Sequence, residues 1–580
     1  MNPTIALLNR LRHFVRTEAQ TQFDALIRQW SRPLAERVAK GYAIEGLNIE
    51  RIHKSLIQLN CKTNNSRFRE GDLLVLHSHN PQDPNALHVE LQYDGGTELE
   101  VSLISGNPIF LSANPQGWII DQDWFDSSPF YLEALNTVAD SLRGRSIILP
   151  LLQRTLTSKI DYARYERTAQ DLQEMGLNES QIEAVSQAYA SDLLYMIQGP
   201  PGTGKTLMLA YLARLLANDG QRVLVTALTH RAIHNALNKI FIVDDDLPVC
   251  KIGGSQHISD LDVPNFETFD LSLFGDLNDG YIIGATPFSI QTQRLANVEF
   301  DVVLFDEASQ ITLPLAIMGM LAGNKYIFIG DENQLPPVTI LSEKEAAQTS
   351  IFDYLSGIGN ETMLNITYRL NDVLTDWPNK TFYQGKLKTS EEASKRRLIL
   401  SSQSTHWDFV LDPSSPAVFL DLCHRNTTIR SHREAETIIE LILALLVHGI
   451  SPDAFGVVVP FRAQSRLIRS LLRRTIENEE IWSRIVVDTV ERMQGQEREV
   501  ILISFTTASP SFASQMADFL FQPQRLNVAV TRPRSKLILV GSHHMLEGEQ
   551  ISQNHAEHFS LLRDLIDTCL VITLPDGLLE

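Results

Sequence analysis

The sequence predicts an α/β fold with two parallel-sheet lobes, preceded by a helical stalk and a small, barrel-like β module. Short apolar segments alternate with helical segments from Leu193 to about Val338, and the alternation starts again at Ala417. Strands that are apolar throughout are typical of parallel sheets covered on both faces. A glycine-rich loop at residues 199–206 follows the first of these strands. The two lobes are therefore expected to share an architecture and to differ in chemistry.

Composition excludes several classes of protein. At 580 residues the chain is too long for one hydrophobic core. Its 43% hydrophobic and 21% charged residues are typical of a globular protein. No apolar run approaches the roughly eighteen residues of a membrane span, and no basic-then-apolar signal opens the chain. We therefore expect no membrane partner.

The cysteines and the net charge further restrict the class of protein and its compartment. Four cysteines are spread along the chain without a C-x-x-C pair: Cys61, Cys250, Cys423 and Cys569. This spacing argues against a zinc module or an iron–sulfur cluster and favours a reducing, cytoplasmic compartment. The formal net charge of −20 argues against a non-specific nucleic-acid coat. A local cationic channel stays compatible with it, because binding depends on the field at the groove.

Three segments are predicted before the first lobe. Residues 1–48 form a helical arm, because apolar residues from Leu7 to Trp30 follow one helical face with a weak break in the middle. Ser31-Arg32-Pro33 indicates the N-cap and first turn of a second helix. Residues 49–119 hold short strand-like segments separated by proline and Asp-Gly-Gly turns, which predicts a small antiparallel barrel. Residues 120–176 form a second helical arm. The alternative for this region is an unrelated accessory domain.

Residues 177–345 are predicted to form the first lobe, with a surface insertion over residues 243–280 where the alternation is interrupted. Residues 346–580 form the second lobe. Its buried strands begin near Ala417, Val457, Ile485, Val500 and Leu537. Between the first two of them a helix opens at a capping box, Ser431-His432-Arg433-Glu434. Because this lobe has no phosphate loop, it is suited to complete the site of the first lobe across a cleft.

The glycine-rich loop fits the pattern G-x-x-x-x-G-K-[ST] with Gly199, Pro200, Pro201, Gly202, Thr203, Gly204, Lys205 and Thr206. An apolar strand precedes it and a helical run follows, which is the context that a phosphate-binding loop requires. The glycines let backbone N–H groups turn toward phosphates, and the helix N-terminus adds partial positive charge. Lys205 is expected to reach the β- and γ-phosphates of ATP, and the Thr206 hydroxyl to bind Mg²⁺.

Acidic and amide residues follow two other strands of the first lobe. Asp306 comes directly after an apolar strand, where a carboxylate is suited to hold Mg²⁺ in a sheet that carries a phosphate loop. The adjacent Glu307 is expected to take a proton from the attacking water. Two adjacent acids are by themselves more often a solvated turn, and their pairing with Lys205 favours the catalytic interpretation. Gln334, after the next strand, is suited to contact the γ-phosphate or the attacking water.

These residues and several further motifs resemble a superfamily 1 helicase, in family order from about Leu177 to about Val540. The resemblance is to the 5′-to-3′ branch that includes the nonsense-mediated-decay RNA helicase and the Okazaki-fragment nuclease-helicase. The other matching segments are residues 177–181, 229–233, 284–286, 367–370, 460–464, 489–497 and 525–532. The resemblance implies two RecA-like lobes of a P-loop nucleoside triphosphatase.

The resemblance also implies roles for individual residues. Gln181 would read the adenine, Tyr368 would stack on the base, and Arg369 would approach the γ-phosphate. Gly495 and Glu497 would complete the nucleotide site from the second lobe. Arg532 would act as the arginine finger. The candidates for contact with nucleic acid, which lie in matching motifs, are Thr229, Thr286, Phe461 and Thr489.

The chain departs from the family pattern at Pro533, where relatives have a small residue, and at Leu370-Asn371, where they have methionine and histidine. Neither change removes a catalytic group. Without cysteine clusters, the resemblance implies neither a zinc-rich regulatory domain nor an iron–sulfur nuclease. The chain resembles a bare motor with arms and a barrel.

The sequence therefore predicts an enzyme that hydrolyses ATP with Mg²⁺ between two lobes and moves along single-stranded DNA or RNA. The 5′-to-3′ direction rests on the resemblance alone. The alternatives are an ATP-driven nucleoprotein remodeller without strand separation and an ATP-gated binding switch with vestigial turnover. The intact catalytic residues argue against the switch. DNA and RNA are not distinguished, because the expected contacts are to the backbone.

Overall fold

The computed structural model describes residues 3–109, 111, 114–254, 258, 260–272, 274–277, 279–341, 348–550 and 555–574. The chain forms two units. Residues 1–136 with 339–345 make the N-terminal unit, and residues 137–338 with 346–580 make the second. Within the described residues, no helix combines the length and the apolar character that crossing a membrane requires.

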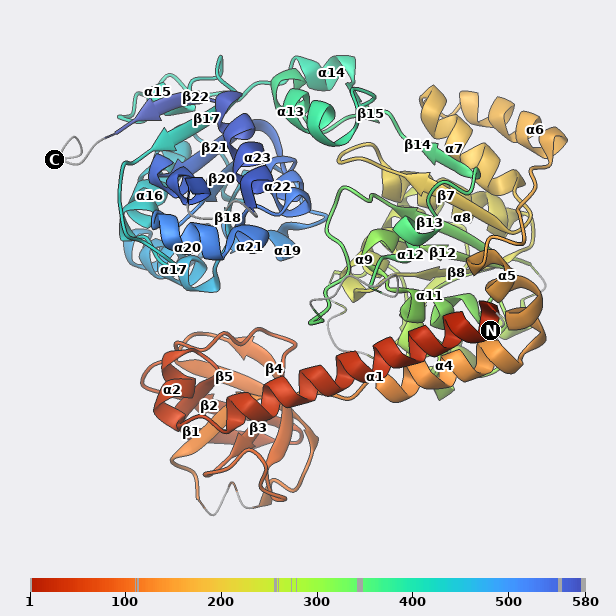
Figure 1. The fold of residues 1–580 in the computed structure, drawn as a ribbon, viewed down its shortest axis with the longest axis horizontal. Coiled ribbons are helices and arrows are strands. Elements are labelled where there is room, and N and C mark those ends of the chain that lie inside the picture. The colour runs from red at the N-terminus through yellow and green to blue at the C-terminus, as the bar shows by residue number, and fades with distance from the viewer. Residues whose placement is uncertain are drawn as a thin grey trace. The chain divides into compact units, whose positions relative to one another are not determined.

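A closed antiparallel barrel is the centre of the N-terminal unit (Figure 1). Its strands are β1 (Ala43–His53), β2 (Leu56–Asn60), β3 (Leu73–His77), β4 (Leu87–Asp94), β5 (Glu98–Ser105) and β6 (Trp118–Gln122), in the order β1-β2-β5-β4-β3-β6. Alternate residues of each strand face the interior. Fully buried side chains such as Leu47, Leu74 and Val101 form the core. The predicted barrel is confirmed.

The helices of this unit differ from the prediction in detail. α1 (Pro3–Trp30) is continuous, so the predicted break is wrong, and α2 (Leu34–Ala39) has Pro33 at its N-cap. The Ser31 hydroxyl instead donates to the carbonyl of Ile27 at 2.7 Å, one turn back in α1. α4 (Ser128–Asp140) follows the barrel in the sequence.

The barrel strands also extend beyond the predicted β module. β1 begins at Ala43 and β6 ends at Gln122, so strand residues lie inside both segments predicted as helical arms. The cause is the mixed pattern of β1, where Ala43, Ile44 and Leu47 are buried around the exposed Glu45 and Gly46. β1 also shifts register between Ile44 and Leu47 against β6. Such an irregularity interrupts the alternation that marks a strand in sequence.

A short segment from a distant part of the sequence belongs to the N-terminal unit. The backbone N–H groups of Ile340 and Leu341 donate to the two carboxylate oxygens of Glu18 in α1, at 2.8 and 3.3 Å. One side chain thus holds two successive residues of the segment. The chain is therefore joined to this unit both at residue 136 and through residues 339–341.

The first lobe of the second unit is built on an eight-stranded sheet in which every pairing is parallel. Its order is β10-β9-β11-β8-β12-β13-β7-β14. The strands are β7 (Leu194–Gln198), β8 (Arg222–Thr226), β9 (Val249–Ile252), β10 (Asn265–Phe266), β11 (Tyr281–Gly284), β12 (Val302–Phe305), β13 (Lys325–Gly330) and β14 (Glu361–Met363). The carboxyl ends of parallel strands meet at one edge of a sheet, which gathers the loops that follow them.

Helices cover this sheet. They are α5 (Leu149–Leu152), α6 (Tyr162–Gln173), α7 (Glu179–Ala190), α8 (Lys205–Asn218), α9 (His230–Val243), α10 (Pro287–Ile290), α11 (Leu313–Met320) and α12 (Ile351–Leu355). One core joins fully buried residues of α7, α8 and α9 to those of the strands, among them Val185, Leu212 and Leu237. This packing fixes the start of α8, where the phosphate loop ends.

Two parts of the predicted boundaries of this lobe are corrected. The expected surface insertion at residues 243–280 contributes β9, which is buried and pairs with β11, and the short β10 at the sheet edge. β9 was missed because Lys251 interrupts a strand of only four residues. β14 pairs with β7 although it lies beyond residue 345, the predicted end of the lobe. A strand of three residues that begins with Glu361 gives no recognisable strand pattern.

The second lobe holds a six-stranded parallel sheet in the order β19-β18-β20-β21-β17-β22. Its strands are β17 (Ala417–Asp421), β18 (Phe455–Val459), β19 (Val486–Thr489), β20 (Arg498–Ser504), β21 (Pro533–Gly541) and β22 (Leu570–Thr573). β15 (Ile366–Thr367) and β16 (Lys388–Thr389) form a separate pair. The helices are α13 (Asp372–Phe382), α14 (Glu391–Ser394), α15 (Asp408–Leu411), α16 (His432–Val447), α17 (Arg462–Thr475), α18 (Glu479–Trp482), α19 (Val490–Met493), α20 (Pro510–Gln515), α21 (Ala517–Leu520), α22 (Pro523–Val530) and α23 (Ala556–Asp567). Two parallel-sheet lobes confirm the predicted fold class.

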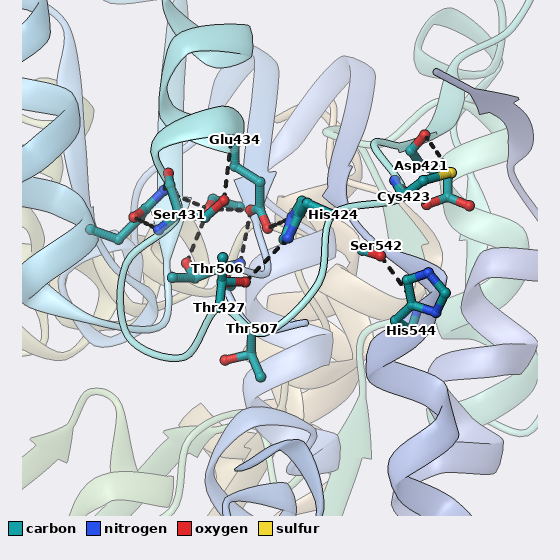
Figure 2. A network of polar contacts seen from close by, with 12 residues as sticks. Asp421, Cys423, His424, Thr427, Ser431, Glu434, Thr506, Thr507, Ser542 and His544 are labelled. Atoms are coloured by element: carbon teal, nitrogen blue, oxygen red, sulfur yellow. Dashed lines mark hydrogen bonds and ion pairs between the residues drawn. The ribbon is translucent and has the colours of Figure 1, made fainter. Parts of the chain in front are cut away.

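The capping box predicted at the start of α16 is half correct (Figure 2). The Ser431 hydroxyl accepts from the N–H of Glu434, as an N-cap should. The Glu434 carboxylate does not return to Ser431, whose N–H donates to Gln464 at 2.8 Å. Glu434 is fully buried and instead binds His424 and Thr506 at 2.8 Å each, together with the Ser504 hydroxyl. A buried carboxylate takes the partners that best offset its desolvation.

A second buried carboxylate fixes α2 to the barrel. Asp121 in β6 accepts from the guanidinium of Arg37 in α2 and pairs with His77 Nε2 of β3 at 2.9 Å, all on one oxygen. The side chains of all three residues are at most 5% exposed. Removing one partner of a buried ion pair costs much more than breaking an exposed pair.

Asp121→Asn is therefore expected to destabilise the N-terminal unit by about 3–5 kcal/mol, because Arg37 keeps a buried charge without its carboxylate. Asp123→Asn is the matched control. Asp123 pairs with the half-exposed His88, and loss of such a pair costs about 0–1 kcal/mol. Hydrogen exchange of barrel peptides during urea unfolding of the full chain measures both. Equal free energies of unfolding would contradict the role given to Asp121.

Candidate nucleotide-binding site

The phosphate loop lies between β7 and α8 and has the backbone that its glycines allow. Gly202 and Gly204 adopt φ of +73° and +90°, and α8 starts at Lys205 directly after Gly204. Lys205 Nζ donates to the carbonyl of Gly199 at 2.5 Å, and the Thr203 hydroxyl donates to that of Pro200 at 2.8 Å. Burial lowers the pKa of Lys205, and the carboxylates of Glu307 and Asp331 act in the opposite direction. Thr206 lies in the first turn of α8.

Gln181 holds the loop from outside. Its side-chain oxygen accepts from the N–H of Asn178 at 3.1 Å, and its amide donates to the carbonyl of Thr203 at 3.0 Å. Gln181 is 3% exposed, and with Asn178 it forms a capping box at the start of α7. The Asn-x-x-Gln pattern was available in the sequence as a helix-start signal. An amide has further donor and acceptor capacity, so this arrangement leaves it able to meet a base.

Residues 367–369 pack against the other side of the loop. The Thr367 hydroxyl donates to the carbonyl of Pro201, and the N–H of Tyr368 donates to that of Gly202, both at 2.8 Å. The Tyr368 hydroxyl accepts from Asn178 at 2.9 Å, while 42% of the residue stays exposed. The exposed ring is available for stacking on a base.

Two acidic residues, Asp306 and Glu307, follow β12, and their carboxylates act electrostatically on Lys205 of the phosphate loop. Asp306 is buried and accepts from the N–H of Glu307 at 2.9 Å. Burial, and next the Glu307 carboxylate, raise the pKa of Asp306 above its usual range. A bound divalent cation would favour the ionised form. Glu307 has a left-handed backbone, φ +50°, and its side chain accepts from Gln494 of the second lobe at 3.1 Å.

Gln334 meets a third acid, Asp331, after β13. Its amide donates to Asp331 Oδ2 at 2.8 Å, and the hydroxyl of Tyr383 donates to the same oxygen at 2.8 Å. All three residues are at most 3% exposed. Burial raises the pKa of Asp331, and the Lys205 charge with these two hydrogen bonds limits the rise.

Two arginines complete the charge pattern. Arg369 Nε donates to Glu497 at 2.7 Å, and its NH1 group donates to the carbonyl of Thr531 at 3.1 Å. Although burial acts in the opposite direction, Arg369 holds the pKa of Glu497 below its usual value. Arg532 is 1% exposed and donates to the carbonyls of Val528 and Gln496 at 2.7 and 3.2 Å. Burial, and next the like charge of Arg369, lower the pKa of Arg532 to about 9.

This donor set fits a nucleoside triphosphate with a divalent cation. Lys205, the N-terminus of α8 and the two arginines supply positive charge, and Asp306 and Thr206 supply oxygen ligands of the kind Mg²⁺ prefers. Gly495, φ +75°, lies in the segment that carries Gln494 and Glu497. No local sequence pattern assigns a role to Gln494, Asp331 or Tyr383, because their roles depend on contacts between distant segments.

The four nucleic-acid candidates each occupy an N-cap after a strand. Thr229 caps α9, Thr286 caps α10, Phe461 precedes α17 and Thr489 precedes α19. Thr229 is exposed, whereas Thr489 is buried and Phe461 stacks on Phe519 with ring centroids 5.8 Å apart. These positions share the carboxyl edges of their sheets with the nucleotide site. The described contacts do not bring the four side chains together.

Comparison with known proteins follows the same division into lobes. Two family models, each described as an AAA domain, match residues 176–267 with 276–343 and residues 347–544. The parallel sheets and the phosphate loop define a P-loop nucleoside triphosphatase with two RecA-like lobes. The chain is similar to the superfamily 1 helicases, and within them to the DNA2 group.

Two curated relatives show the extent of the similarity. The "DNA replication ATP-dependent helicase/nuclease dna2" of Schizosaccharomyces pombe is 28% identical over 480 residues, which are 76% of this chain and 33% of that protein. The DNA2 protein of Mus musculus is 30% identical over 409 residues, 63% of this chain and 37% of that one. The chain spans about a third of the length of these relatives. The arterivirus nonstructural protein 10 helicase structure aligns at a TM-score of 0.38 with 12% identity, over 88% of this chain and 80% of that chain.

Gly202→Ala is expected to weaken binding of a fluorescent ATP analogue by about tenfold or more, equivalent to roughly 1.4 kcal/mol. A Cβ at Gly202 would lie 2.4 Å from Arg369 Cβ and 2.6 Å from Thr367 Oγ1, on a backbone at φ +73°. Gly220→Ala is the matched control, since it has φ +76° and nothing within 4 Å. Its cost is confined to backbone strain. Equal affinities of the two variants for the analogue would contradict the close packing described for the loop.

Proposed function

We propose that the chain is an ATP-driven translocase and helicase that moves along single-stranded nucleic acid. The observation that carries the proposal is the gathering of complementary groups from both lobes at one site. Lys205, Asp306 and Glu307 belong to the first lobe, whereas Arg532 and Glu497, which binds Arg369, belong to the second lobe. The names of the relatives, ATP-dependent helicase/nucleases, support it.

In this proposal each residue of the site has one task. Gly199, Pro200, Pro201, Gly202, Thr203, Gly204 and Lys205 hold the phosphates, and Gln181, Tyr368, Gly495 and Glu497 complete the nucleotide pocket. Thr206 and Asp306 hold Mg²⁺, which when bound neutralises charge on the phosphates. Glu307 accepts a proton from the attacking water, and its bond to Gln494 fixes the carboxylate. Gln334 contacts the γ-phosphate. Phosphoryl transfer depends mainly on such positioning and charge neutralisation.

Arg369 and Arg532 link hydrolysis to the arrangement of the lobes. Arg532 is held by hydrogen bonds to carbonyls of its own lobe, so its position follows that lobe. An arginine finger stabilises charge that develops in the transition state. Opening and closing of the two lobes would then alternate with hydrolysis and move the protein along the strand.

The strand is proposed to cross the carboxyl edges of both sheets, at Thr229, Thr286, Phe461 and Thr489. The N-termini of α9 and α17 at this edge suit phosphate contacts, because a helix N-terminus carries partial positive charge. We propose single-stranded DNA as the first substrate, because the relatives are named for DNA replication. Movement from 5′ to 3′ rests on the family resemblance, and a cytoplasmic location is consistent with four free cysteines.

Arg532→Ala is expected to lower the ATPase rate by roughly 10³–10⁵, the usual contribution of an arginine finger, while ATP binding persists. Arg534→Ala is the matched control. It removes a half-exposed pair with Glu499 and keeps the hydrogen bonds that hold Arg532 and Arg369. Steady-state ATPase and binding of a fluorescent ATP analogue separate the two effects. An Arg532→Ala enzyme that turns over at the wild-type rate would exclude the finger assignment.

The ATPase rate is expected to rise when single strand is added, because strand and nucleotide share the two lobes. Titration with single-stranded DNA and RNA, with Lys205→Ala and Glu307→Gln as inactive references, measures this. Unwinding of duplexes with 5′ or 3′ tails then tests strand separation and its direction. ATPase that ignores both nucleic acids would refute the proposed function. Stimulated ATPase without unwinding would point to the remodeller instead.

A further inference from the structure

A chain of hydrogen bonds connects Gln334 to the helix that precedes the arginine finger. The Gln334 amide and the Tyr383 hydroxyl both donate to Asp331 Oδ2, each at 2.8 Å. The Tyr383 oxygen in turn accepts from the amide of Asn527 in α22 at 3.0 Å. Asp331, Tyr383 and Asn527 are at most 2% exposed. Water therefore does not compete for these bonds, and each one constrains its neighbours.

The direction of every bond in the chain is fixed by its partners. The Asn527 amide also donates to the carbonyl of Asn333 at 2.7 Å. A carbonyl can only accept, so the nitrogen of Asn527 must face it. A carboxylate accepts as well, so Tyr383 must donate to Asp331. Burial and the Asp331 charge raise the pKa of Tyr383 well above its usual value, which keeps the hydroxyl proton in place.

Both ends of the chain are anchored in functional segments. Asn527 lies on α22, and the Thr531 hydroxyl beyond it donates to the Asn527 carbonyl. Thr531 also receives a hydrogen bond from Arg369 and neighbours Arg532. At the other end, Leu335, next to Gln334, belongs to the hydrophobic core of the second lobe. A displacement of α22 therefore reaches the turn that carries Gln334.

We propose that Tyr383 is a positioning residue that transmits the placement of α22 to Gln334 through the carboxylate of Asp331. The proposal rests on the proposed ATP hydrolysis, in which Gln334 contacts the γ-phosphate. Movement of the second lobe that carries Arg532 toward or away from the nucleotide also moves Asn527. Tyr383 then reorients the carboxylate that holds the Gln334 amide. The rate of hydrolysis then depends on the position of the second lobe in two ways, through the arginine finger Arg532 and through Gln334.

Tyr383→Phe tests the relay because it removes one oxygen and keeps the ring. We expect kcat of the strand-stimulated ATPase to fall about 10- to 100-fold, the usual effect of a mispositioned catalytic group, with KM for ATP changed less than about threefold. Tyr326→Phe is the matched control, since Tyr326 is fully buried and donates to the Gly323 carbonyl at 2.7 Å, at the opposite end of β13. If Tyr383→Phe has a normal kcat and a Tm lowered by the same amount as that of Tyr326→Phe, then Tyr383 has only a structural role.

A double-mutant cycle with Asn527→Ala tests whether the two residues act in series. We expect the double variant to match the slower single variant within about twofold, whereas multiplied effects would overturn the relay. A wild type without strand stimulation would refute the proposed function instead. In that case a binding measurement tests the relay, namely the ratio of the affinities of the protein for a non-hydrolysable ATP analogue and for ADP. Tyr383→Phe is expected to lower that preference about threefold or more, and an unchanged ratio would exclude the relay.

Discussion

Parallel strands end at a common edge of their sheet, and the arrangement of the nucleotide site depends on this constraint. In the first lobe β7, β12 and β13 lie near one another in the sheet, so Lys205, Asp306 and Asp331 are gathered although they are far apart in the sequence. In the second lobe the same geometry applies to β19 and β18, which lead into Thr489 and Phe461. Two sheets of this kind can hold complementary groups toward a shared ligand.

Charge balance then determines which of these groups can stay buried. Lys205, Asp306, Asp331 and Arg532 all have pKa values shifted by burial toward the neutral form. Such clustering of shifted pKa values is characteristic of functional sites. In contrast, Asp121 in the barrel and Glu434 in the second lobe bind partners that tie neighbouring elements together. The buried groups of the nucleotide site are therefore suited to bind a charged ligand, whereas Asp121 and Glu434 hold neighbouring elements together.

Local patterns accounted for most of the fold and for the residue types of the site. The phosphate loop, the acids after β12 and most strands of both sheets follow from runs of neighbouring residues. Elements without such a run were missed: β9 contains Lys251, β14 has three residues, and β22 exposes Leu570 and Val571. The capping box at Ser431 formed only in half for a related reason, because the Glu434 side chain binds residues outside its helix, two of which, Ser504 and Thr506, lie some seventy residues later in the chain.

The site residues that the sequence missed depend on contacts between distant segments. Gln494 meets Glu307, and Tyr383 joins Asp331 to Asn527, across large separations in sequence. Gln494 and Tyr383 each lie directly after a helix, α19 and α13, and a single glutamine or tyrosine at such a position does not indicate its distant partner. Gln181 illustrates the intermediate case. Its position was identified by resemblance, but its support of the Thr203 carbonyl emerges only from the fold.

The segment at residues 339–341 has a consequence for how the N-terminal unit is attached. It lies a few residues beyond Gln334, and its N–H groups are held by Glu18 of α1. The segment is covalently continuous with the second unit, and hydrogen bonds to Glu18 hold it to the N-terminal unit. A cut near residue 136 would break the covalent link between the barrel and the rest of the chain and leave the hydrogen bonds to Glu18. Residues 339–341 lose conformational freedom through these bonds, because one carboxylate fixes two successive backbone N–H groups.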